Sequence, residues 1–317
     1  MGNILVTGSA GQIGSELVPA LRNIYGESTV IAGWNKTPLP EDISKGPNVL
    51  LDVTDFEAIN KVVKNFEISS IFHMSSILSA TAEAIRNTAH NVNINGTFNV
   101  LESAHQNGVE KVMLPSSIAA FGDKTPRDMT PNDTIQNPDT VYGISKVFGE
   151  LMGNYYYSKL GLDVRGIRLP GVISWKTEPT AGTTDYAVAM FYEAIKSNSY
   201  ECYLAPDTSL PMMYMPDAIN ALVNLFKADH GNLIHHSDFN VHAMTFTPEA
   251  LAVEVKRINP KFQIEYQIDP ARQAIANSWP SSLDDSVARK EWGWKPQYSI
   301  RELAEDMYKN LVTKLAS

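Results

Sequence analysis

Short apolar runs alternate with amphipathic stretches through the first half of the chain. The runs have the length and β-branched content of buried strands, whereas the longer stretches repeat apolar residues at helical spacing. The predicted strands cover residues 4–7, 29–32, 49–52, 70–74, 111–115 and 163–169. The predicted helices cover residues 13–25, 56–65, 92–106 and 141–160. Strands that alternate with helices need crossover connections, so the pattern predicts an α/β fold with a doubly wound parallel sheet.

The pattern changes after residue 169, where Gly, Pro and Thr cluster and short strands and helices mix with polar loops. Residues 212–217 and 218–228 nevertheless predict a strand and a helix that return to the first sheet, with Asp217 as the cap of that helix. We therefore expect two lobes. The first contains residues 1–170 and about 212–239, and the second is a smaller, discontinuous C-terminal lobe of about 171–211 and 240–317. Ligand pockets of such a sheet open at the carboxyl ends of its strands.

The composition narrows the possible partners. Hydrophobic residues make up 44% and charged residues 19% of the 317 residues, which indicates a globular rather than a disordered protein. The formal net charge of -9 opposes binding to nucleic acid or to an anionic membrane surface. Cys202 is the single cysteine, so an intrachain disulfide and a cysteine-rich metal site are excluded. Without a signal segment or an apolar run of membrane-spanning length, we expect a soluble, cytoplasmic protein, although an organelle matrix suits one cysteine equally well.

The sequence GSAGQIG lies between the first predicted strand and the first predicted helix. Gly8 permits a tight turn, Gly11 lets the backbone approach a pyrophosphate, and Gly14 allows the helix to pack closely on the sheet. The amino end of the helix offers free N–H groups and a positive dipole to the phosphates. The motif therefore predicts a Rossmann dinucleotide site that includes Gln12 and Ile13, with a glycine-rich turn that binds no ligand as the alternative.

The adenosine end of this site is less well specified. An acidic residue about 20 positions beyond the glycines commonly binds the ribose hydroxyls, but residues 32–36 contain no acid. Asn35 is a candidate for the ribose, and Lys36 for a 2′-phosphate. Asp52 and Val53 follow the third predicted strand and are candidates for the adenine edge, although Asp52 also suits an ordinary helix cap. NAD is thus favoured and NADP stays possible.

Tyr142 and Lys146 lie four residues apart and so share one face of a predicted helix. Tyrosine ionises at about pH 10, but a neighbouring ammonium lowers its pKa and makes it a usable general base. The same lysine can hold the nicotinamide ribose. Tyr155 and Lys159 have the same spacing but lie about 220° around the helix from the first pair. We choose the first pair because it follows a helix start, and we place Tyr155 in the core or an interface.

A serine hydroxyl at the end of the fifth predicted strand can hydrogen-bond a substrate oxygen as charge develops on it. Ser116 and Ser117 both occupy this position. Taken in order, the glycine motif, these serines, Tyr142 and Lys146 resemble the extended short-chain dehydrogenase/reductase family, in its UDP-galactose-epimerase-like group. The spacing in that family selects Ser117. The segment NINGT, which begins at Asn93, is similar to the fourth-helix motif of the group and implies that Asn93 lies beside the cofactor.

More specific segments occur in the second half of the chain. GTTDY at 182–186, LPMMYM at 210–215 and SWP at 278–280 resemble the L-threonine 3-dehydrogenases within this group, and the resemblance covers nearly the whole chain. It implies NAD-dependent oxidation of the C3 hydroxyl of L-threonine to 2-amino-3-ketobutyrate without a metal. The substrate residues that it implies are Ser79, Ser117, Tyr142, Gly182, Thr183 and Thr184. The further cofactor contacts that it implies are Met74, Ser75, Tyr142, Lys146 and Leu169.

Members of this family often pair through two helices from each chain, which implies a homodimer through residues 92–106 and 141–160. The main alternative activity is that of a nucleotide-sugar epimerase or dehydratase, which residues 171–239 disfavour because they contain no arginine for a diphosphate. A non-catalytic dinucleotide-binding protein is the other alternative. The methionines at 212, 213 and 215 indicate core packing, and we expect the pair His235–His236 to be solvated rather than to bind a metal.

Overall fold

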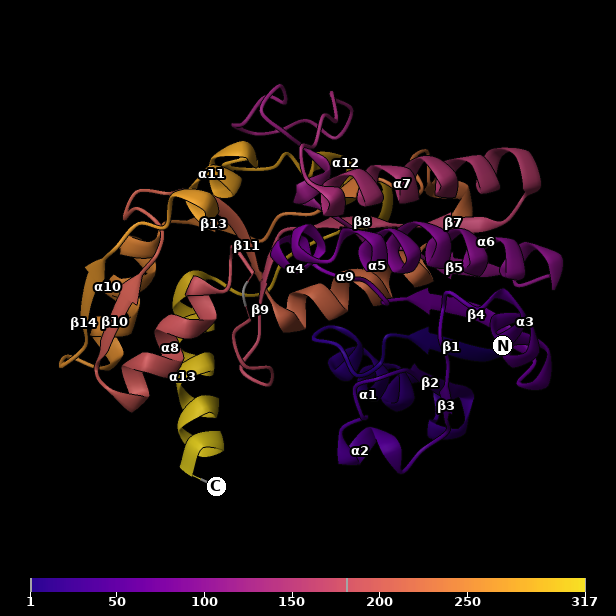
Figure 1. The fold of residues 1–317 in the computed structure, drawn as a ribbon, viewed down its shortest axis with the longest axis horizontal. Helices are drawn as coiled ribbons and strands as arrows, with labels where there is room; N and C mark the ends of the chain where they lie inside the picture. The colour runs from indigo at the N-terminus through magenta and orange to yellow at the C-terminus, as the bar shows by residue number, and fades with distance from the viewer. Residues whose placement is uncertain (1, 181, 317) are drawn as a thin grey trace.

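The computed structural model describes residues 2–180 and 182–316. Its centre is a six-stranded sheet with the order β3-β2-β1-β4-β5-β7, in which every neighbouring pair is parallel. The strands are β1 Asn3–Thr7, β2 Val30–Trp34, β3 Asn48–Leu50, β4 Ile68–His73, β5 Lys111–Met113 and β7 Asp163–Arg165. This order is that of a doubly wound sheet, so the predicted fold class is confirmed (Figure 1).

Alternate residues of the central strands enter different cores. Ile4 and Val6 pack on the face covered by α1 (Gly14–Tyr25) and α9 (Met215–Lys227), whereas Leu5 packs on the opposite face. That opposite face is covered by α3 (Phe56–Asn65), α6 (Gly96–Gln106) and α7 (Val141–Leu160). Strands buried on both faces explain the continuous apolar runs in the sequence.

A second group of elements, drawn at the left of Figure 1, holds several short strands and most of the C-terminal helices. It contains β9 (Gly171–Ile173), β11 (Leu210–Tyr214) and β13 (Met244–Phe246) in one sheet, and β10 (Ser199–Cys202) with β14 (Gln263–Tyr266) in another. The prediction that the strand at 212–217 returns to the first sheet is therefore wrong, because β11 pairs with β9 and β13, although the following helix α9 does pack on the central sheet. Its helices are α8 Tyr186–Lys196, α10 Pro248–Ile258, α11 Pro270–Ser278 and α13 Ile300–Ala316. The small helix α2 (Glu41–Ser44) belongs to the first lobe, and α12 (Ser286–Trp292) packs near β12 (Phe239–Asn240).

Two predicted elements are divided in the structure. The strand predicted at 163–169 forms β7 and then β8 (Ile167–Leu169), which leaves the central sheet and pairs with β6 (Ser116–Ser117) and β12. Gly166 makes the step because a side chain there would meet the carbonyl oxygen of Leu114 at 2.5 Å. The helix predicted from residue 92 begins earlier, as α5 (Arg86–His90), and passes through a π-helical turn at Asn91–Asn95 before α6.

Two predictions for single side chains are wrong. Asp217 lies inside the first turn of α9 and does not cap it; its carboxylate accepts the backbone N–H groups of Gln297 at 2.9 Å and Tyr298 at 3.1 Å. It therefore fixes the loop before α13 instead. His236 is 4% exposed and stacks on Tyr157, so the solvated prediction fails for it. The packing prediction for the three methionines is confirmed, since each is at most 1% exposed.

Candidate active site

The glycine motif has the backbone geometry of a phosphate-binding turn. Gly8 has φ +66°, and a side chain there would lie 2.7 Å from the backbone nitrogen of Ser75. A side chain at Gly14 would lie 2.3 Å from the carbonyl oxygen of Gly8. Helix α1 starts at Gly14, and the Ile13 side chain makes no capping hydrogen bond. The N–H groups of Ser15 and Leu17 are bonded to the carbonyls of Gly11 and Ile13. The turn and the positive end of the α1 dipole, rather than these N–H groups, fit the pyrophosphate of a dinucleotide.

A cavity of about 240 Å³ opens beside this turn, at the carboxyl ends of β1, β4 and β6. It brings together residues predicted for the cofactor and residues predicted for the substrate. The cofactor candidates that line it are Gly11, Gln12, Ile13, Met74, Lys146 and Leu169, and the substrate candidates are Ser79, Ser117, Tyr142, Gly182, Thr183 and Thr184. All six substrate candidates therefore face one space, although they come from four separate segments of the chain.

The remaining cofactor candidates lie outside this cavity. Gly8 shapes the turn, and Ser75 borders a second, smaller cavity. Asn93 lies behind the loop at 76–77, where its amide accepts the N–H of Ile77 at 2.8 Å and donates to the carbonyl of the same residue at 2.9 Å. In the structure, Asn93 therefore stabilises this loop.

At the adenosine end, Asp52 and Asn35 lie side by side. Burial raises the pKa of the Asp52 carboxyl, but hydrogen bonds from Thr54 and Asn35, with the charge of Lys36, bring it below its ordinary value. The carboxylate accepts the N–H of Thr54 at 2.9 Å and its hydroxyl at 2.8 Å. Val53 is buried against Gly96. An acidic side chain, that of Asp52, is thus present near the end of β2, but it follows the neighbouring strand β3.

The catalytic candidates come from α7 and β6. Helix α7 begins at a capped end, because the Thr140 side chain accepts the N–H of Gly143 at 3.0 Å and Glu83 accepts the N–H of Val141 at 2.7 Å. Lys146 donates from Nζ to the carbonyl of Pro115 at 3.0 Å, and its Nζ lies 5.3 Å from the centroid of the Tyr142 ring. The predicted helix 141–160 is therefore found with its bounds, and it points both side chains towards β6.

The protonation of the pair differs from the sequence-based expectation. Burial raises the pKa of Tyr142 to about 12, against an opposing hydrogen bond from Ser117. Burial also lowers the pKa of Lys146 to about 8, while the charge of Glu150 acts in the opposite direction. The prediction of a net lowering of the Tyr142 pKa is thus wrong for the protein without its ligands. The cost of desolvating the phenolate raises this pKa more than the neighbouring groups lower it.

His73 was not predicted as part of the site. It ends β4, is 4% exposed, and borders the same cavity. Its ring nitrogens lie 2.9 Å from the hydroxyl of Thr7 and 3.3 Å from that of Thr97. Burial and the charge of Lys146 lower its pKa to about 3, so it is neutral at physiological pH. A polar residue that closes an apolar strand, as in ISSIFH, is the sequence signal that could have identified it.

The segment at 182–185, just before α8, lines the substrate side of the cavity. Tyr203 donates its hydroxyl to the carbonyl oxygens of Gly182 at 2.9 Å and Thr183 at 3.3 Å. The Thr183 hydroxyl is buried and has no hydrogen-bond partner among the described residues, so it is available to a ligand. Trp279, which falls in the SWP segment, also lines the cavity. Tyr203 and Trp279 were not among the predicted site residues.

Two properties of the described residues bear on possible ligands and location. No group of three or more His, Cys, Asp or Glu side chains in residues 2–180 and 182–316 is arranged to hold a metal ion. Within the same described residues, every helix falls short of the length or apolarity that a membrane span requires.

The fold and this cavity define a class of protein. The chain belongs to the NAD dependent epimerase/dehydratase family, and the family model matches residues 4–241. The matched range includes the glycine turn, the pair Tyr142 and Lys146, and the loop at 182–186.

Individual relatives are more specific. The X-ray structure of an L-threonine dehydrogenase from Clostridium difficile is 48% identical, with a TM-score of 0.96 over 99% of this chain and 98% of that one. A structure described as a monomeric L-threonine 3-dehydrogenase from a metagenome, in its apo form, is 43% identical, with a TM-score of 0.93 over 99% and 100% of the two chains. The mitochondrial L-threonine 3-dehydrogenase of Bos taurus is 45% identical over 96% of this chain and 81% of its own length.

Proposed function

We propose that this protein oxidises the C3 hydroxyl of L-threonine to 2-amino-3-ketobutyrate, with NAD as the hydride acceptor. One observation carries the proposal: Ser117, Tyr142 and Lys146 border the same cavity as the glycine turn and the loop at 182–184. A dinucleotide, a proton acceptor and a small substrate can therefore meet at one place. The similarity to L-threonine dehydrogenases at 43–48% identity supports the choice of substrate.

The residues present fit a nicotinamide dinucleotide. The turn at Gly8 and the positive dipole at the amino end of α1 would hold the pyrophosphate, and Lys146 would hold the nicotinamide ribose. When bound, oxidised NAD supplies the hydride acceptor and a positive charge. We choose NAD over NADP because the carboxylate of Asp52, bonded to Asn35, would repel a 2′-phosphate. Measured affinities should favour NAD, and the preference should weaken in Asp52→Asn; equal affinities in the native protein would refute the choice.

Tyr142 is the proposed general base, and Ser117 places the hydroxyl oxygen of the substrate. With a pKa of about 12, the phenol holds its proton at neutral pH unless cationic charge favours the phenolate. Lys146 can provide this positive charge, because its pKa is about 8 and its ammonium form is favoured at a pH below that value. Proton transfer thus runs from the substrate hydroxyl to Tyr142, with Ser117 and Lys146 stabilising the negative charge on the two oxygens.

The cavity suits a small zwitterion better than a nucleotide-sugar. Its volume is about 240 Å³, and among its described lining residues Lys146 is the one Lys or Arg. A nucleotide-sugar would add a second diphosphate away from the glycine turn, and this group would need more cationic contacts than Lys146 alone. We propose that the hydroxyls of Ser79, Thr183 and Thr184 bind the carboxylate and ammonium groups. The unpartnered hydroxyl of Thr183 supports this assignment, because a buried donor gains most from a ligand.

Formation of reduced nicotinamide, followed by absorbance, tests the proposal. Purified protein is incubated with NAD and either L-threonine, a UDP-sugar or no substrate. The proposal predicts a rise in absorbance with L-threonine alone. Tyr142→Phe is the matched control, since it removes the hydroxyl but keeps the ring, and it should bind NAD without turnover. Rapid turnover of the UDP-sugar would favour an epimerase instead, and cofactor binding without any turnover would favour a non-catalytic protein.

We also propose a homodimer through α6 and α7. Phe98 on α6 is 43% exposed, and Ile144, Leu151 and Tyr155 on α7 are 51%, 63% and 50% exposed. Such apolar exposure on adjacent helices is typical of an interface. Analytical ultracentrifugation should give twice the mass of one chain, and Leu151→Lys should give a single chain. A native monomer, as the metagenomic relative is described, would refute the proposal.

Two further expectations remain proposals. We place the protein in the cytoplasm, which fractionation of the source cells would test, with recovery in an organelle as the contrary result. The two-lobe division assigns residues 1–170 and about 212–239 to cofactor binding, and about 171–211 with 240–317 to substrate binding. It is supported by the glycine turn in the first lobe and by the loop at 182–184 in the second.

A further inference from the structure

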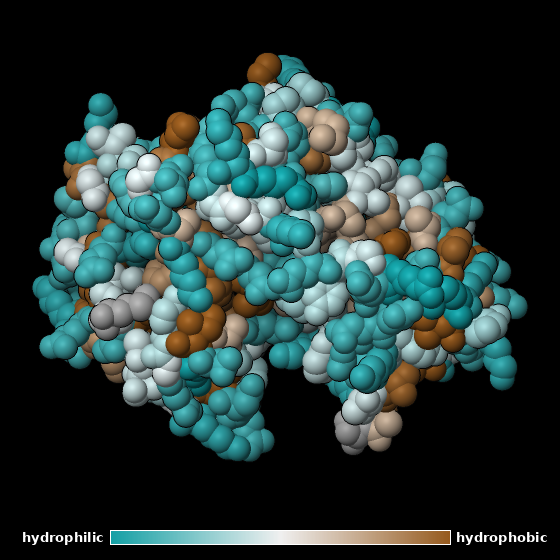
Figure 2. Space-filling model, turned by 180° about the vertical axis from the view of Figure 1, so that it is seen from behind, coloured by the Kyte–Doolittle hydropathy of each residue, from teal (hydrophilic) through white to brown (hydrophobic). Residues whose placement is uncertain are grey.

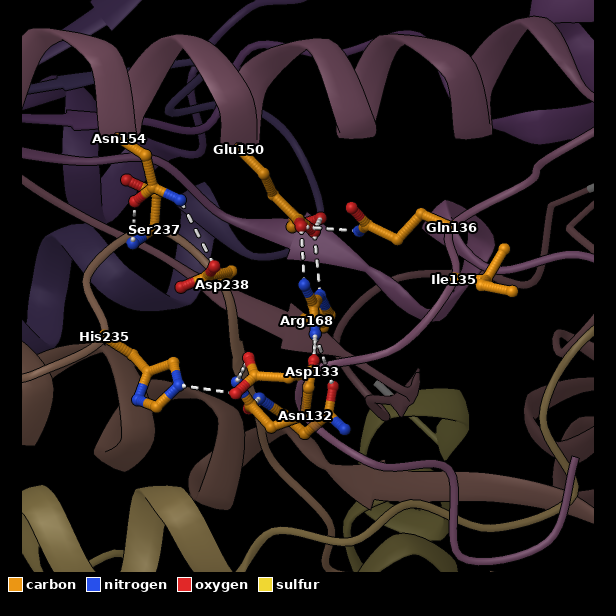
Figure 3. Close-up of polar contacts among 12 residues, drawn as sticks. Asn132, Asp133, Ile135, Gln136, Glu150, Asn154, Arg168, His235, Ser237 and Asp238 are labelled. Carbon is orange, nitrogen blue, oxygen red and sulfur yellow. Dashed lines mark hydrogen bonds and ion pairs between the residues drawn. The ribbon is translucent and has the colours of Figure 1, made fainter. Parts of the chain in front are cut away.

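Glu150 is a buried carboxylate that lies on α7 one helical turn beyond Lys146. It is 3% exposed. Arg168 donates to it twice, from Nε at 3.0 Å and from Nη2 at 2.8 Å, and Gln136 donates at 2.6 Å. Ser116 donates its hydroxyl to the same carboxylate. Figure 3 shows Arg168 and Gln136 beside Glu150. Both carboxylate oxygens are therefore fully bonded, which is the arrangement in which a buried ion pair is tolerated.

Arg168 connects this carboxylate to the strands. It lies on β8, where it pairs in register with Ser116 of β6, while Leu169 pairs with Ser117. Its Nη1 donates to the carbonyl of Asn132 at 2.7 Å, below Arg168 in Figure 3, and to the side chain of Asn240 at 3.1 Å. The guanidinium also lies 5.0 Å above the ring of Phe121. Each of the three guanidinium nitrogens has a hydrogen-bond partner, so the position of the group is fixed.

The contacts of Glu150 join the two elements that carry the catalytic candidates. Tyr142 and Lys146 come from α7, and Ser117 comes from β6. The hydroxyl of Ser116, the residue before Ser117, is bonded to Glu150 of the helix. A displacement of α7 along its axis would break this bond and both bonds to Arg168. The spacing between the base and the serine thus depends on a side chain that does not border the substrate cavity.

Glu150 also shares a small polar cavity with Lys146. The cavity has a volume of about 10 Å³, enough for about one water molecule, and Ser116, Asn93 and His73 border it as well. The titratable groups near the ammonium are Glu150 and Tyr142 on α7 and the neutral His73 on β4, while Arg168 on β8 is paired with Glu150. Glu150 is the one carboxylate among the described residues that line this cavity. Its charge raises the pKa of Lys146 against the effect of burial.

We propose that Glu150 is a positioning residue, which sets the charge of Lys146 and the distance between helix α7 and Ser117 through its contacts with Ser116 and Arg168. The proposal rests on the function assigned to Lys146 above. It treats Glu150 as a group that acts through its neighbours, since it does not touch the substrate cavity.

Glu150→Gln tests the electrostatic part. The variant keeps the size of the side chain and removes its charge, so the Lys146 pKa should fall further. The alkaline limb of kcat/KM for L-threonine should then move to lower pH by about one pH unit. The pH at which NADH affinity weakens, measured by fluorescence titration, should move in the same direction. Unchanged pH profiles for both measurements would overturn the proposal.

Two controls separate this role from a structural one. Asp163→Asn breaks a second arginine–carboxylate pair, in which the half-buried Asp163 and the buried Arg165 lie 2.8 Å apart outside the cavity. It should lower Tm comparably and leave both pH profiles in place. Ser116→Ala keeps the Glu150 charge and removes its bond to β6; it should lower kcat several-fold without moving the alkaline limb. A shift of the profile in Asp163→Asn, or full kcat in Ser116→Ala, would contradict the proposal.

An unfolded Glu150→Gln protein would not end the test. The double variant E150Q/R168M leaves no unpaired buried charge and carries the same prediction for the pH of NADH binding. If the native protein fails to oxidise L-threonine, the proposed function fails, and NADH binding still reports on Lys146. If it oxidises L-threonine and the NADH profile is the same with and without Glu150, the positioning role alone fails.

Discussion

The neutral state of His73 makes the fold sensitive to acid. Its pKa is about 3 in the folded protein, against 6.5 for an unperturbed histidine, first because the ring is buried and then because Lys146 is near. Protonation therefore favours the unfolded chain. The stability that the neutral ring contributes is complete above pH 6.5 and is lost progressively as the pH falls from 6.5 towards 3.

The size of the effect follows from these two values. Each pH unit within this window removes about 1.4 kcal/mol from the free energy of unfolding. Between pH 7.5 and pH 5.0, where the unfolded histidine becomes protonated and the folded one does not, the loss is about 2 kcal/mol. Typical domains have only about 5–15 kcal/mol in total, so this loss is measurable.

Urea unfolding followed by tryptophan fluorescence at pH 7.5 and pH 5.0 measures the loss. His73→Asn is the matched variant, because an amide can still bond the hydroxyl of Thr7. Other titrating groups are common to both proteins, so the difference between them isolates His73. The pH-induced loss should be about 2 kcal/mol smaller in the variant. An equal loss in both proteins would show that His73 is not held neutral by its surroundings.

Three further changes test the site. Tyr142→Phe should reduce kcat by about 10²–10⁴-fold with little effect on NAD affinity, and near-native turnover would exclude the phenol as base. Gly14→Val should abolish NADH binding in a fluorescence titration, because its side chain would collide with the carbonyl of Gly8, and unchanged binding would place the phosphates elsewhere. Glu83→Ala should lower Tm and kcat by uncapping α7, whereas Glu83→Gln, which keeps an acceptor for Val141, should lower both less; equal effects would argue against the cap.

Elements that carry their own local signals were predictable from the sequence. Helix α7 has its predicted bounds because Thr140 caps its start and Gly161, with φ +73°, ends it. The glycine turn was predictable because three glycines occupy positions where a side chain would meet backbone. The local signals also allowed Tyr142 and Lys146 to be predicted as a pair, because a helix determines which of its residues share a face.

Features that depend on distant residues were not predictable. The π-helical turn before Gly96 accompanies packing of that glycine against Val53, more than 40 positions earlier in the chain. Asp217 carries a typical capping residue type but is bonded to backbone 80 residues away. The direction of the Tyr142 pKa follows from its burial, which no spacing rule contains. The network around Glu150 likewise requires β6, β8 and α7 to meet.

Transfer of deuterium from L-threonine labelled at C3 tests the central claim most directly. The protein is incubated with the labelled substrate and NAD, and the reduced cofactor is examined by mass spectrometry. The account predicts one deuterium in the reduced nicotinamide, because the hydride leaves C3 as Tyr142 takes the hydroxyl proton. Reduced cofactor without the label, or no reduced cofactor at all, would contradict it.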